Sequence, residues 1–313
     1  MRSTDTFIKD TSSSQLERAR ALALPSREAM LNRAPSVQNF WDSNRQLLIN
    51  AWHEWDKSET SCLTMPDKTL IDSKLRNAVE QAWKKPAEEQ AVKALLQEVS
   101  PDVFQFQFFD PERLVDLRTY LDAVSDAQIP LRPPYGIVLN RRGAMLDKRS
   151  EGFLAAPSFQ DFYRDLVDTY MRPIARMLFP DVVGYDTQTF GFSIQWQAGM
   201  DASLRTHTDA SAATLNINLN LPGEAFVGSE VDFYDNATGE VNRLSFKPGT
   251  AMIHRGRVAH AARPITSGTR TNFVLWLYGE RGQIPLQNTL PQSIDVGQRW
   301  TVPPTKQDDI APF

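Results

Sequence analysis

The residues with the clearest chemical potential in this chain are three candidate metal ligands in its C-terminal half. His207 and Asp209 are separated by one residue, so an extended backbone would direct both side chains to the same side. His260 follows about fifty residues later, which is enough chain for several short strands to return to the same place. Two neutral imidazoles and one carboxylate can occupy one face of a metal ion and leave its other positions open. We therefore predict that these side chains form a metal centre.

The donor types favour a catalytic iron over a structural zinc. A structural zinc ion usually has four ligands, often including cysteines, whereas this chain has one cysteine, Cys62. Two histidines and one carboxylate are typical of non-haem iron(II) oxygenases, in which the open positions bind a co-substrate and dioxygen. A His-x-Asp triplet by itself also occurs as a surface or hydrogen-bonded pair, so the hypothesis depends on companion residues.

Arg270 is the companion residue that favours 2-oxoglutarate as co-substrate. It lies 10 residues after His260, at the start of a predicted strand and beyond a predicted turn at residues 265–269. A guanidinium group can hold a carboxylate through two parallel hydrogen bonds. Such a contact would fix the far end of 2-oxoglutarate while its keto-acid end chelates iron. Without the metal ligands, a surface ion pair would be the better interpretation of this arginine.

Several amides and one further histidine lie near these residues in the sequence. Asn216 and Asn218 are on the polar side of the strand predicted just after the first two ligands. Asn272 is two residues past Arg270 and therefore on the same face. All three amides could bind co-substrate or substrate, and they could equally satisfy backbone groups inside a barrel. We interpret His254 as a neighbour of the ligands or a packing residue.

The elements that must position these residues change in type along the chain. From about Gln15 to Ser125 the apolar residues recur every three or four positions, which predicts helices. After Pro180 apolar and polar residues alternate, which predicts strands. The strands are predicted at residues 192–196, 215–219, 230–234, 241–246, 250–254 and 272–278. Short antiparallel strands at this spacing indicate a sandwich or a jelly-roll barrel.

We expect three parts in the chain and two well-marked helix starts. The parts are an N-terminal helical region packing on the barrel, the strand-rich core and a C-terminal tail, at residues 1–125, 126–285 and 286–313. Asp110 with the proline after it predicts one helix start. Ser158 predicts another, in a helix that Pro173 could kink.

Three motifs resemble the catalytic core of the procollagen lysyl hydroxylases and, more distantly, of the prolyl 4-hydroxylases, which are iron(II)- and 2-oxoglutarate-dependent dioxygenases. The motifs, within residues 207–278, are HTDASAATLNINLN, VDFY and KPGTAMIHRGRVAHAARPITSGTR. The resemblance implies a mainly β core with the double-stranded β-helix (jelly-roll) fold. It implies iron ligation by His207, Asp209 and His260. It also implies that Arg270 binds the carboxylate of 2-oxoglutarate. The cofactors that the resemblance implies are Fe(II), 2-oxoglutarate and dioxygen, with ascorbate as a stimulant.

Composition limits the partners of the protein. The net charge of -4 and the pI near 5.7 give no general reason to bind nucleic acid or an anionic membrane. No apolar run reaches the length that a signal peptide or membrane span needs, and one cysteine suits a reducing compartment. We therefore expect a cytoplasmic protein with a small-molecule substrate. The sequence leaves the oligomeric state open.

The favoured hypothesis is an oxygenase that activates a C–H bond of a small molecule, with an amino-acid-derived metabolite as the first choice. Hydroxylation and oxidative cyclisation are both open, and the whole chain is weakly similar to the ring-forming kainoid synthases of algae. One alternative is hydroxylation of lysyl or prolyl residues in a cytosolic protein. Others are a metal enzyme of the cupin type without 2-oxoglutarate, and a catalytically silent jelly roll that binds a ligand or partner.

Overall fold

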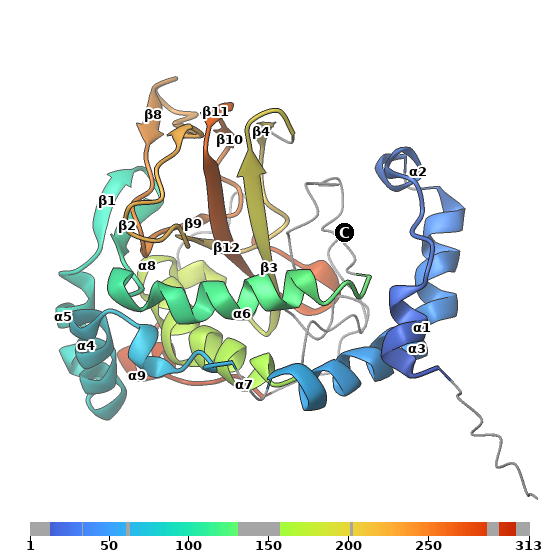
Figure 1. Ribbon diagram of the computed structural model, residues 1–313. Coiled ribbons are helices and arrows are strands. Elements are labelled where there is room, and N and C mark those ends of the chain that lie inside the picture. The colour runs from blue at the N-terminus through green and yellow to red at the C-terminus, as the bar shows by residue number, and fades with distance from the viewer. Residues whose placement is uncertain are drawn as a thin grey trace, which may run out of the picture.

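The computed structural model of the chain describes residues 13–32, 34–60, 63–130, 157–200, 203–286 and 294–304 (Figure 1). Cys62 lies outside the described residues. Figure 1 shows the strands β4, β8 and β10 at the opposite end of the molecule from the helices α4, α7 and α9. The strands are, in chain order, β1 (Gln97–Ser100), β2 (Val103–Gln107), β3 (Gln188–Gln197), β4 (Leu204–His207), β5 (Ala213–Asn218), β6 (Val227–Gly228), β7 (Val231–Tyr234), β8 (Val241–Leu244), β9 (Thr250–Arg255), β10 (His260–Ala262), β11 (Ile265–Ser267) and β12 (Thr269–Tyr278).

The helices come mainly from the part of the chain before β3. The α-helices are α1 (Gln15–Arg20), α2 (Arg27–Leu31), α3 (Pro35–Glu59), α4 (Ser73–Lys84), α5 (Gln90–Lys93), α6 (Leu114–Asp126), α7 (Phe159–Asp165), α8 (Arg172–Leu178) and α9 (Val296–Arg299). Short 3-10 turns lie at Lys68–Leu70, Pro86–Glu88, Pro111–Arg113, Pro180–Val182 and Glu280–Gly282. No helix in the described ranges is both long enough and apolar enough to cross a bilayer.

The strands form a jelly roll, which confirms the fold predicted from the motifs. A six-stranded sheet, the large sheet, has the order β1-β2-β9-β5-β12-β3, and a four-stranded sheet, the small sheet, has the order β4-β10-β7-β8. From β3 onward the chain crosses repeatedly between these two sheets, and every pairing is antiparallel. This winding of paired strands is the double-stranded β-helix. A two-stranded ribbon of β6 and β11 joins one end of it.

The large sheet separates a helical core from the interior of the barrel. Leu215 and Ile217 of β5 and Leu275 of β12 are fully buried among helix side chains. Because side chains alternate along a strand, the residues between them face the small sheet. Thr214 and Asn216 of β5 accordingly line a cavity between the sheets. The helices thus bury one face of the sheet and leave the other for chemistry.

An aromatic contact fixes α7 between α6 and the large sheet. The ring of Phe159 in α7 stacks on Tyr120 of α6, with centroids 5.2 Å apart. Phe159 also meets Phe273 of β12 edge-on, with centroids 6.2 Å apart. All three side chains are fully buried. Large aromatic rings contribute much of the apolar area that a core buries, so this contact should anchor the helical layer.

Two helix predictions are confirmed with a change of detail. Asp110 accepts a hydrogen bond from the Glu112 amide at 3.0 Å, just before α6. Ser158 precedes α7 as expected, but its hydroxyl donates to Asp56 instead of capping the helix. Pro173 lies in the first turn of α8, directly after a π-helical stretch at Leu166–Met171. Pro173 has no amide to donate to the carbonyl of Thr169, and that carbonyl accepts a hydrogen bond from Trp83 Nε1 at 2.9 Å.

One local prediction is wrong, and another is refined. Residues 97–107 were expected to be helical, but they form β1 and β2, and β2 pairs with β9 in the large sheet. The alternation of Phe104 and Phe106 with glutamines is a strand pattern, and pairing along the sheet outweighs the helical context. The turn predicted within residues 265–269 is present at Gly268, whose φ is 74°, and the residues before it, 265–267, form β11. The division of the chain at residues 125 and 285 stays a prediction.

We predict that Phe159→Ala lowers the free energy of unfolding by about 3–5 kcal/mol, because it leaves a large cavity between α6, α7 and β12. The control is Val115→Ala on α6, where the side chain is 49% exposed, and which should cost less than about 1 kcal/mol. Urea unfolding followed by circular dichroism measures both. Equal losses in the two variants would contradict the anchoring role of Phe159.

Candidate metal centre and active-site cavity

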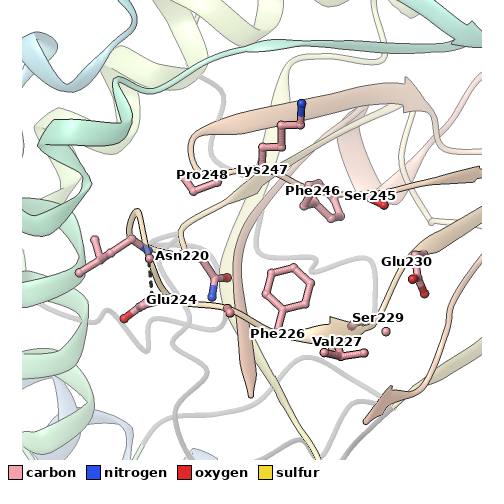
Figure 2. Close-up of a pocket in the computed structure, with 14 residues that line it drawn as sticks. Asn220, Glu224, Phe226, Val227, Ser229, Glu230, Ser245, Phe246, Lys247 and Pro248 are labelled. Atoms are coloured by element: carbon pink, nitrogen blue, oxygen red, sulfur yellow. Dashed lines mark hydrogen bonds between the residues drawn. The ribbon is translucent and has the colours of Figure 1, made fainter. Parts of the chain in front are cut away.

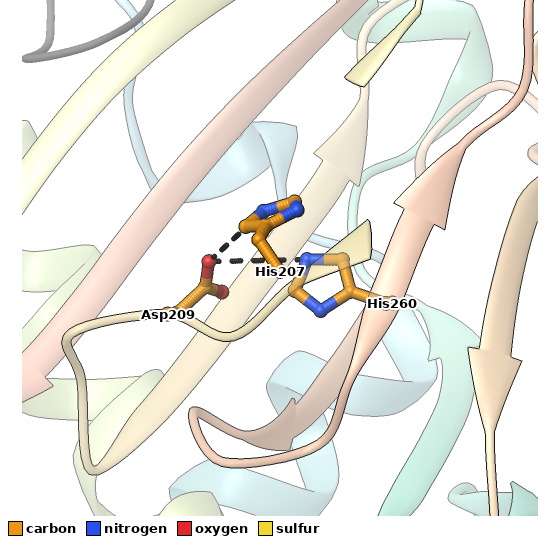
Figure 3. Close-up of side chains that lie close together, drawn as sticks. All are labelled: His207, Asp209 and His260. Carbon is orange, nitrogen blue, oxygen red and sulfur yellow. Dashed lines mark ion pairs between the residues drawn. The ribbon is translucent and has the colours of Figure 1, made fainter. Parts of the chain in front are cut away.

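The pairing of β4 with β10 brings two of the predicted metal ligands together. His207 ends β4, His260 begins β10, and the two residues are direct partners in the antiparallel register. Their imidazole rings have centroids 4.3 Å apart. Figure 3 shows Asp209 approaching both rings from the loop that follows β4. Residues that are distant in the sequence therefore converge because of strand register.

The loop that carries Asp209 is held by a glycine on another segment. The amide of Asp209 donates to the carbonyl of Gly256 at 2.8 Å. A β-carbon on Gly256 would lie 1.9 Å from the carbonyl oxygen of Ser211, so a larger residue cannot pack there without moving the loop. Close backbone approach of this kind is a common reason for a glycine. The turn after β9 therefore positions the carboxylate.

The distances between the donor atoms suit a single metal ion. The Asp209 Oδ1 atom lies 3.5 Å from His207 Nε2 and 3.8 Å from His260 Nε2. One ligand atom from each residue lies within 4.8 Å of the other two. Among the described residues this is the cluster of histidine and carboxylate side chains that could hold a metal. The donor set fits iron(II), which these side-chain types bind as a facial group.

Backbone carbonyls leave the correct imidazole nitrogens available for a metal. The Nδ1 atom of His207 lies 2.8 Å from the carbonyl oxygen of Arg205, and that of His260 lies 3.0 Å from the carbonyl oxygen of Val258. A carbonyl can only accept a hydrogen bond, so each Nδ1 carries the proton and each Nε2 keeps a free lone pair. These contacts also fix the orientation of both rings, as expected for metal ligands.

The ionisable side chains of the site shift one another's pKa values. Burial alone would raise the pKa of Asp209, but His260, His207 and the hydroxyl of Thr214 hold that pKa well below its ordinary range. Burial lowers the pKa of His260, and burial together with His260 lowers the pKa of His254 to about 4. For His207, the carboxylate of Asp209 outweighs burial and raises the pKa above its ordinary value. A metal ion therefore finds an ionised carboxylate, and it must displace a proton from His207 in mildly acidic solution.

A pair of hydroxyl groups orients the carboxylate of Asp209. The Thr214 hydroxyl donates to Asp209 Oδ2 at 2.6 Å, and the Ser211 hydroxyl lies 2.9 Å from that of Thr214. Asp209 and Thr214 are both buried. Because Oδ2 is engaged by Thr214, Oδ1 is directed toward the two imidazoles. The sequence analysis did not single out Thr214. Its position two residues before Asn216 on the same predicted strand could have placed it on the same face, inside the barrel.

The three candidate ligands open into a cavity of about 410 Å³ between the two sheets. Its walls combine the polar site with many apolar side chains from both sheets. The apolar lining residues are Phe192, Ile194, Trp196, Leu204, Val231, Phe233, Phe246, Met252, Val274 and Trp276. A cavity that is mostly apolar with a few convergent polar groups is the usual form of a small-molecule site.

Arg270 lines the same cavity as a buried cation without a carboxylate partner among the described residues. Its side chain is 2% exposed, it donates from Nη1 to the carbonyl of Ser229, and its Nε has no hydrogen-bond partner there. The guanidinium carbon lies 5.6 Å from the ring centre of Trp196 and 5.2 Å from that of Phe246. Burial lowers the pKa of Arg270 to about 9, although the negative charge of Glu230, which forms no ion pair with Arg270, opposes this shift. A buried, incompletely paired guanidinium is well suited to bind an anionic ligand.

The other candidate residues separate into those that reach the cavity and those that do not. Asn216 lines the cavity and accepts a hydrogen bond from the side chain of Asn272 at 2.6 Å. Asn272 is fully buried and also accepts a hydrogen bond from Asn218 at 3.3 Å. Asn272 therefore fixes the orientation of the Asn216 side chain without lining the cavity itself. His254 lines the cavity with Nε2 3.8 Å from Asp209 Oδ2, and its Nδ1 faces the carbonyl of Arg255. The binding roles predicted for Asn216 and Asn272 stay predictions.

Comparison with known proteins finds relatives among oxygenase-domain proteins, and no protein-family model matches the chain. The chain is 31% identical over 191 residues to the 2-oxoglutarate and iron-dependent oxygenase domain-containing protein ICU11 of Arabidopsis thaliana, covering 56% of this chain and 45% of that protein. It is 29% identical over 201 residues to the 2-oxoglutarate and iron-dependent oxygenase domain-containing protein 2 of Danio rerio, covering 61% of this chain and 53% of that protein. These matches confirm the predicted resemblance: the chain is related to proteins that carry an iron- and 2-oxoglutarate-dependent oxygenase domain.

Other similarities are more partial. The human multifunctional procollagen lysine hydroxylase and glycosyltransferase LH3 is 34% identical over 119 residues, covering 36% of this chain and 15% of that protein. A solved prolyl 4-hydroxylase of Phytophthora capsici aligns with a TM-score of 0.47 and 13% identity, covering 75% of this chain and 74% of that one. A prolyl-4-hydroxylase of Pseudomonas putida aligns with a TM-score of 0.42 and 17% identity, covering 66% and 99%. The chain spans about half the length of the curated oxygenase-domain relatives it matches.

We predict that Thr214→Val weakens the binding of a divalent metal by about 10–100-fold, because Asp209 loses the hydrogen bond that orients it. Thr214→Ser, which keeps the hydroxyl, should retain most of the affinity. Titration with Co(II), followed by visible absorbance and calorimetry, measures both variants. Thr271→Val removes a buried hydroxyl that accepts from Gln195 in the same sheet and serves as the control. Metal affinity unchanged in Thr214→Val would refute the orienting role.

Proposed function

We propose that the protein is an Fe(II)- and 2-oxoglutarate-dependent oxygenase that oxidises a C–H bond of its substrate. The observation that carries this proposal is the shared cavity. His207, Asp209 and His260 converge at one part of it, and Arg270 faces the same space as a cation without a carboxylate partner among the described residues. A metal site and a separate anion site are together what a metal-chelating dicarboxylate requires.

The side chains of this chain have distinct roles in the proposed reaction. His207 and His260 would hold the iron through Nε2, and Asp209 would hold it through the oxygen that Thr214 leaves available. Arg270 binds the distal carboxylate of 2-oxoglutarate. When bound, iron and 2-oxoglutarate activate dioxygen for oxidation of the substrate, with release of succinate and carbon dioxide. The apolar walls keep water away from the reacting groups.

The proposed substrate is a small molecule, with an amino-acid-derived metabolite as the first choice and hydroxylation or oxidative cyclisation as the outcome. The size and the apolar lining of the cavity support a small ligand. Cyclisation of the kainoid type stays a hypothesis from sequence similarity. A cytoplasmic location is part of the proposal, with the single cysteine as its argument.

A second candidate is hydroxylation of lysyl or prolyl residues in a protein. The observation in its favour is the similarity over 119 residues to the human multifunctional procollagen lysine hydroxylase and glycosyltransferase LH3. The two candidates require different probes, because a peptide substrate must present an extended chain at the cavity entrance. Lysine- and proline-containing peptides therefore belong in the same screen as metabolites.

The test of the proposed function is the conversion of 2-oxoglutarate to succinate. The purified chain is incubated with Fe(II), ascorbate and 2-oxoglutarate, with metabolite pools or peptides, and succinate and substrate products are measured by mass spectrometry. We expect succinate, and a product that gains one oxygen or loses two hydrogens. Asp209→Asn provides the background rate. Absence both of succinate and of a visible absorption band with Fe(II) and 2-oxoglutarate under anaerobic conditions would overturn the proposal.

We predict that Arg270→Leu weakens 2-oxoglutarate binding by about 2–5 kcal/mol, because the distal carboxylate is left buried without its partner. The same change should not lower the melting temperature of the ligand-free protein, since it removes an incompletely paired buried charge. Calorimetry with Mn(II) and 2-oxoglutarate measures the first effect, and thermal unfolding measures the second. Arg243→Leu, which alters a half-exposed arginine paired with Asp232, is the control. Unchanged 2-oxoglutarate affinity in Arg270→Leu would rule out this role.

A further inference from the structure

Phe246 lies between two hollows of the molecule. It lines the metal cavity, and it also lines an open groove of about 500 Å³ at the neighbouring end of the barrel. Figure 2 shows its ring beside Ser245 and across from Phe226, with Ser229 on the side of Phe226. Only 7% of its surface is exposed. A single aromatic side chain thus forms part of the wall that divides the two spaces.

Arg270 lies directly against this wall. The guanidinium carbon of Arg270 is 5.2 Å from the ring centre of Phe246. Its Nη1 donates to the carbonyl of Ser229, and Ser229 also lines the groove. The candidate anion-binding group is therefore at the end of the metal cavity, and the groove begins on the other side of Phe246 and Ser229.

The Ser229 part of the wall is closely packed backbone. Gly228 and Ser229 both have positive φ angles, 81° and 63°, a conformation that is unusual for serine. A β-carbon on Gly228 would lie 2.3 Å from the carbonyl oxygen of Pro264, so this backbone is packed against the residue that precedes β11. The Ser229 side of the wall consists of packed backbone. Phe246 contributes a side chain, and its size therefore decides how far the cavity extends.

We propose that Phe246 limits the length of the dicarboxylate that the cavity accepts. This inference rests on the proposed function, because it takes the ligand between the metal and Arg270 to be 2-oxoglutarate. A 2-oxo diacid with one more methylene, such as 2-oxoadipate, has to place its extra carbon against the ring of Phe246. A smaller side chain at this position joins the cavity to the groove, and the longer chain can then bend into the vacated space.

The test compares the binding of 2-oxoglutarate and 2-oxoadipate by calorimetry, with Mn(II) in place of iron so that no turnover occurs. We expect the unmodified protein to prefer 2-oxoglutarate by about 10-fold or more, the discrimination that one methylene provides in a closed pocket. In Phe246→Ala this preference should fall to near unity or reverse. The absolute affinity for 2-oxoglutarate should also fall, because water from the groove reaches Arg270 and screens its charge.

Phe226→Ala is the matched control, because Phe226 lines the groove without lining the metal cavity. It should leave the preference unchanged. Circular dichroism establishes that each variant is folded, and if Phe246→Ala does not fold, Phe246→Leu takes its place with a smaller change in the same direction. Equal affinity of the unmodified protein for 2-oxoglutarate and 2-oxoadipate overturns the inference. A preference unchanged in a folded Phe246 variant, or lost equally in Phe226→Ala, overturns it as well.

The same experiment separates this inference from the proposed function. If the unmodified protein with Mn(II) does not bind 2-oxoglutarate, the proposed function itself fails. If it binds 2-oxoglutarate and the Phe246 variants keep its selectivity, the proposed function stands and the role of Phe246 is refuted.

Discussion

The site depends on the antiparallel register of β4 and β10. Direct pairing of His207 with His260 places two imidazoles side by side, even though about fifty residues of chain separate them. A shift of that register by one residue would turn one imidazole to the other face of the small sheet. The same register brings His260 within 3.8 Å of the Asp209 carboxylate. The metal centre is therefore a property of strand pairing more than of any local motif.

A second constraint is the incompletely paired cation inside the barrel. Removing a guanidinium from water is costly, and in the described part of the chain Arg270 has a carbonyl and two aromatic faces as its partners, without a carboxylate. Such an arrangement lowers the stability of the ligand-free fold and favours binding of an anion. The helical layer compensates with a large apolar core, in which Phe159, Tyr120 and Phe273 are fully buried. The incompletely paired guanidinium of Arg270 and the apolar helical core thus lie on opposite faces of the large sheet.

The division of the large sheet into two faces also gathers these polar residues on the side of the cavity. Asn216 lines the cavity, whereas Asn272 and Asn218 lie beside it on the same face, hydrogen-bonded to one another, without lining the cavity. Thr214 lies on the same strand as Asn216 and touches the carboxylate of Asp209. Polar groups inside the barrel therefore either face the ligand space or hold those that do. Buried polar groups of this kind must be hydrogen-bonded, which fixes their geometry.

The sequence by itself determined the donor types, the strand-rich core and the motifs that predicted the fold, because alternation and short motifs are local properties. It also singled out His207, Asp209, His260 and Arg270 as a set. Only the tertiary structure decided that residues 97–107 are strands, that Asn272 supports instead of lining the cavity, and that Thr214 and Phe246 contact the site. These outcomes depend on what packs against each strand. A period-two pattern shows which residues share a face, but it does not show which distant residues lie opposite them.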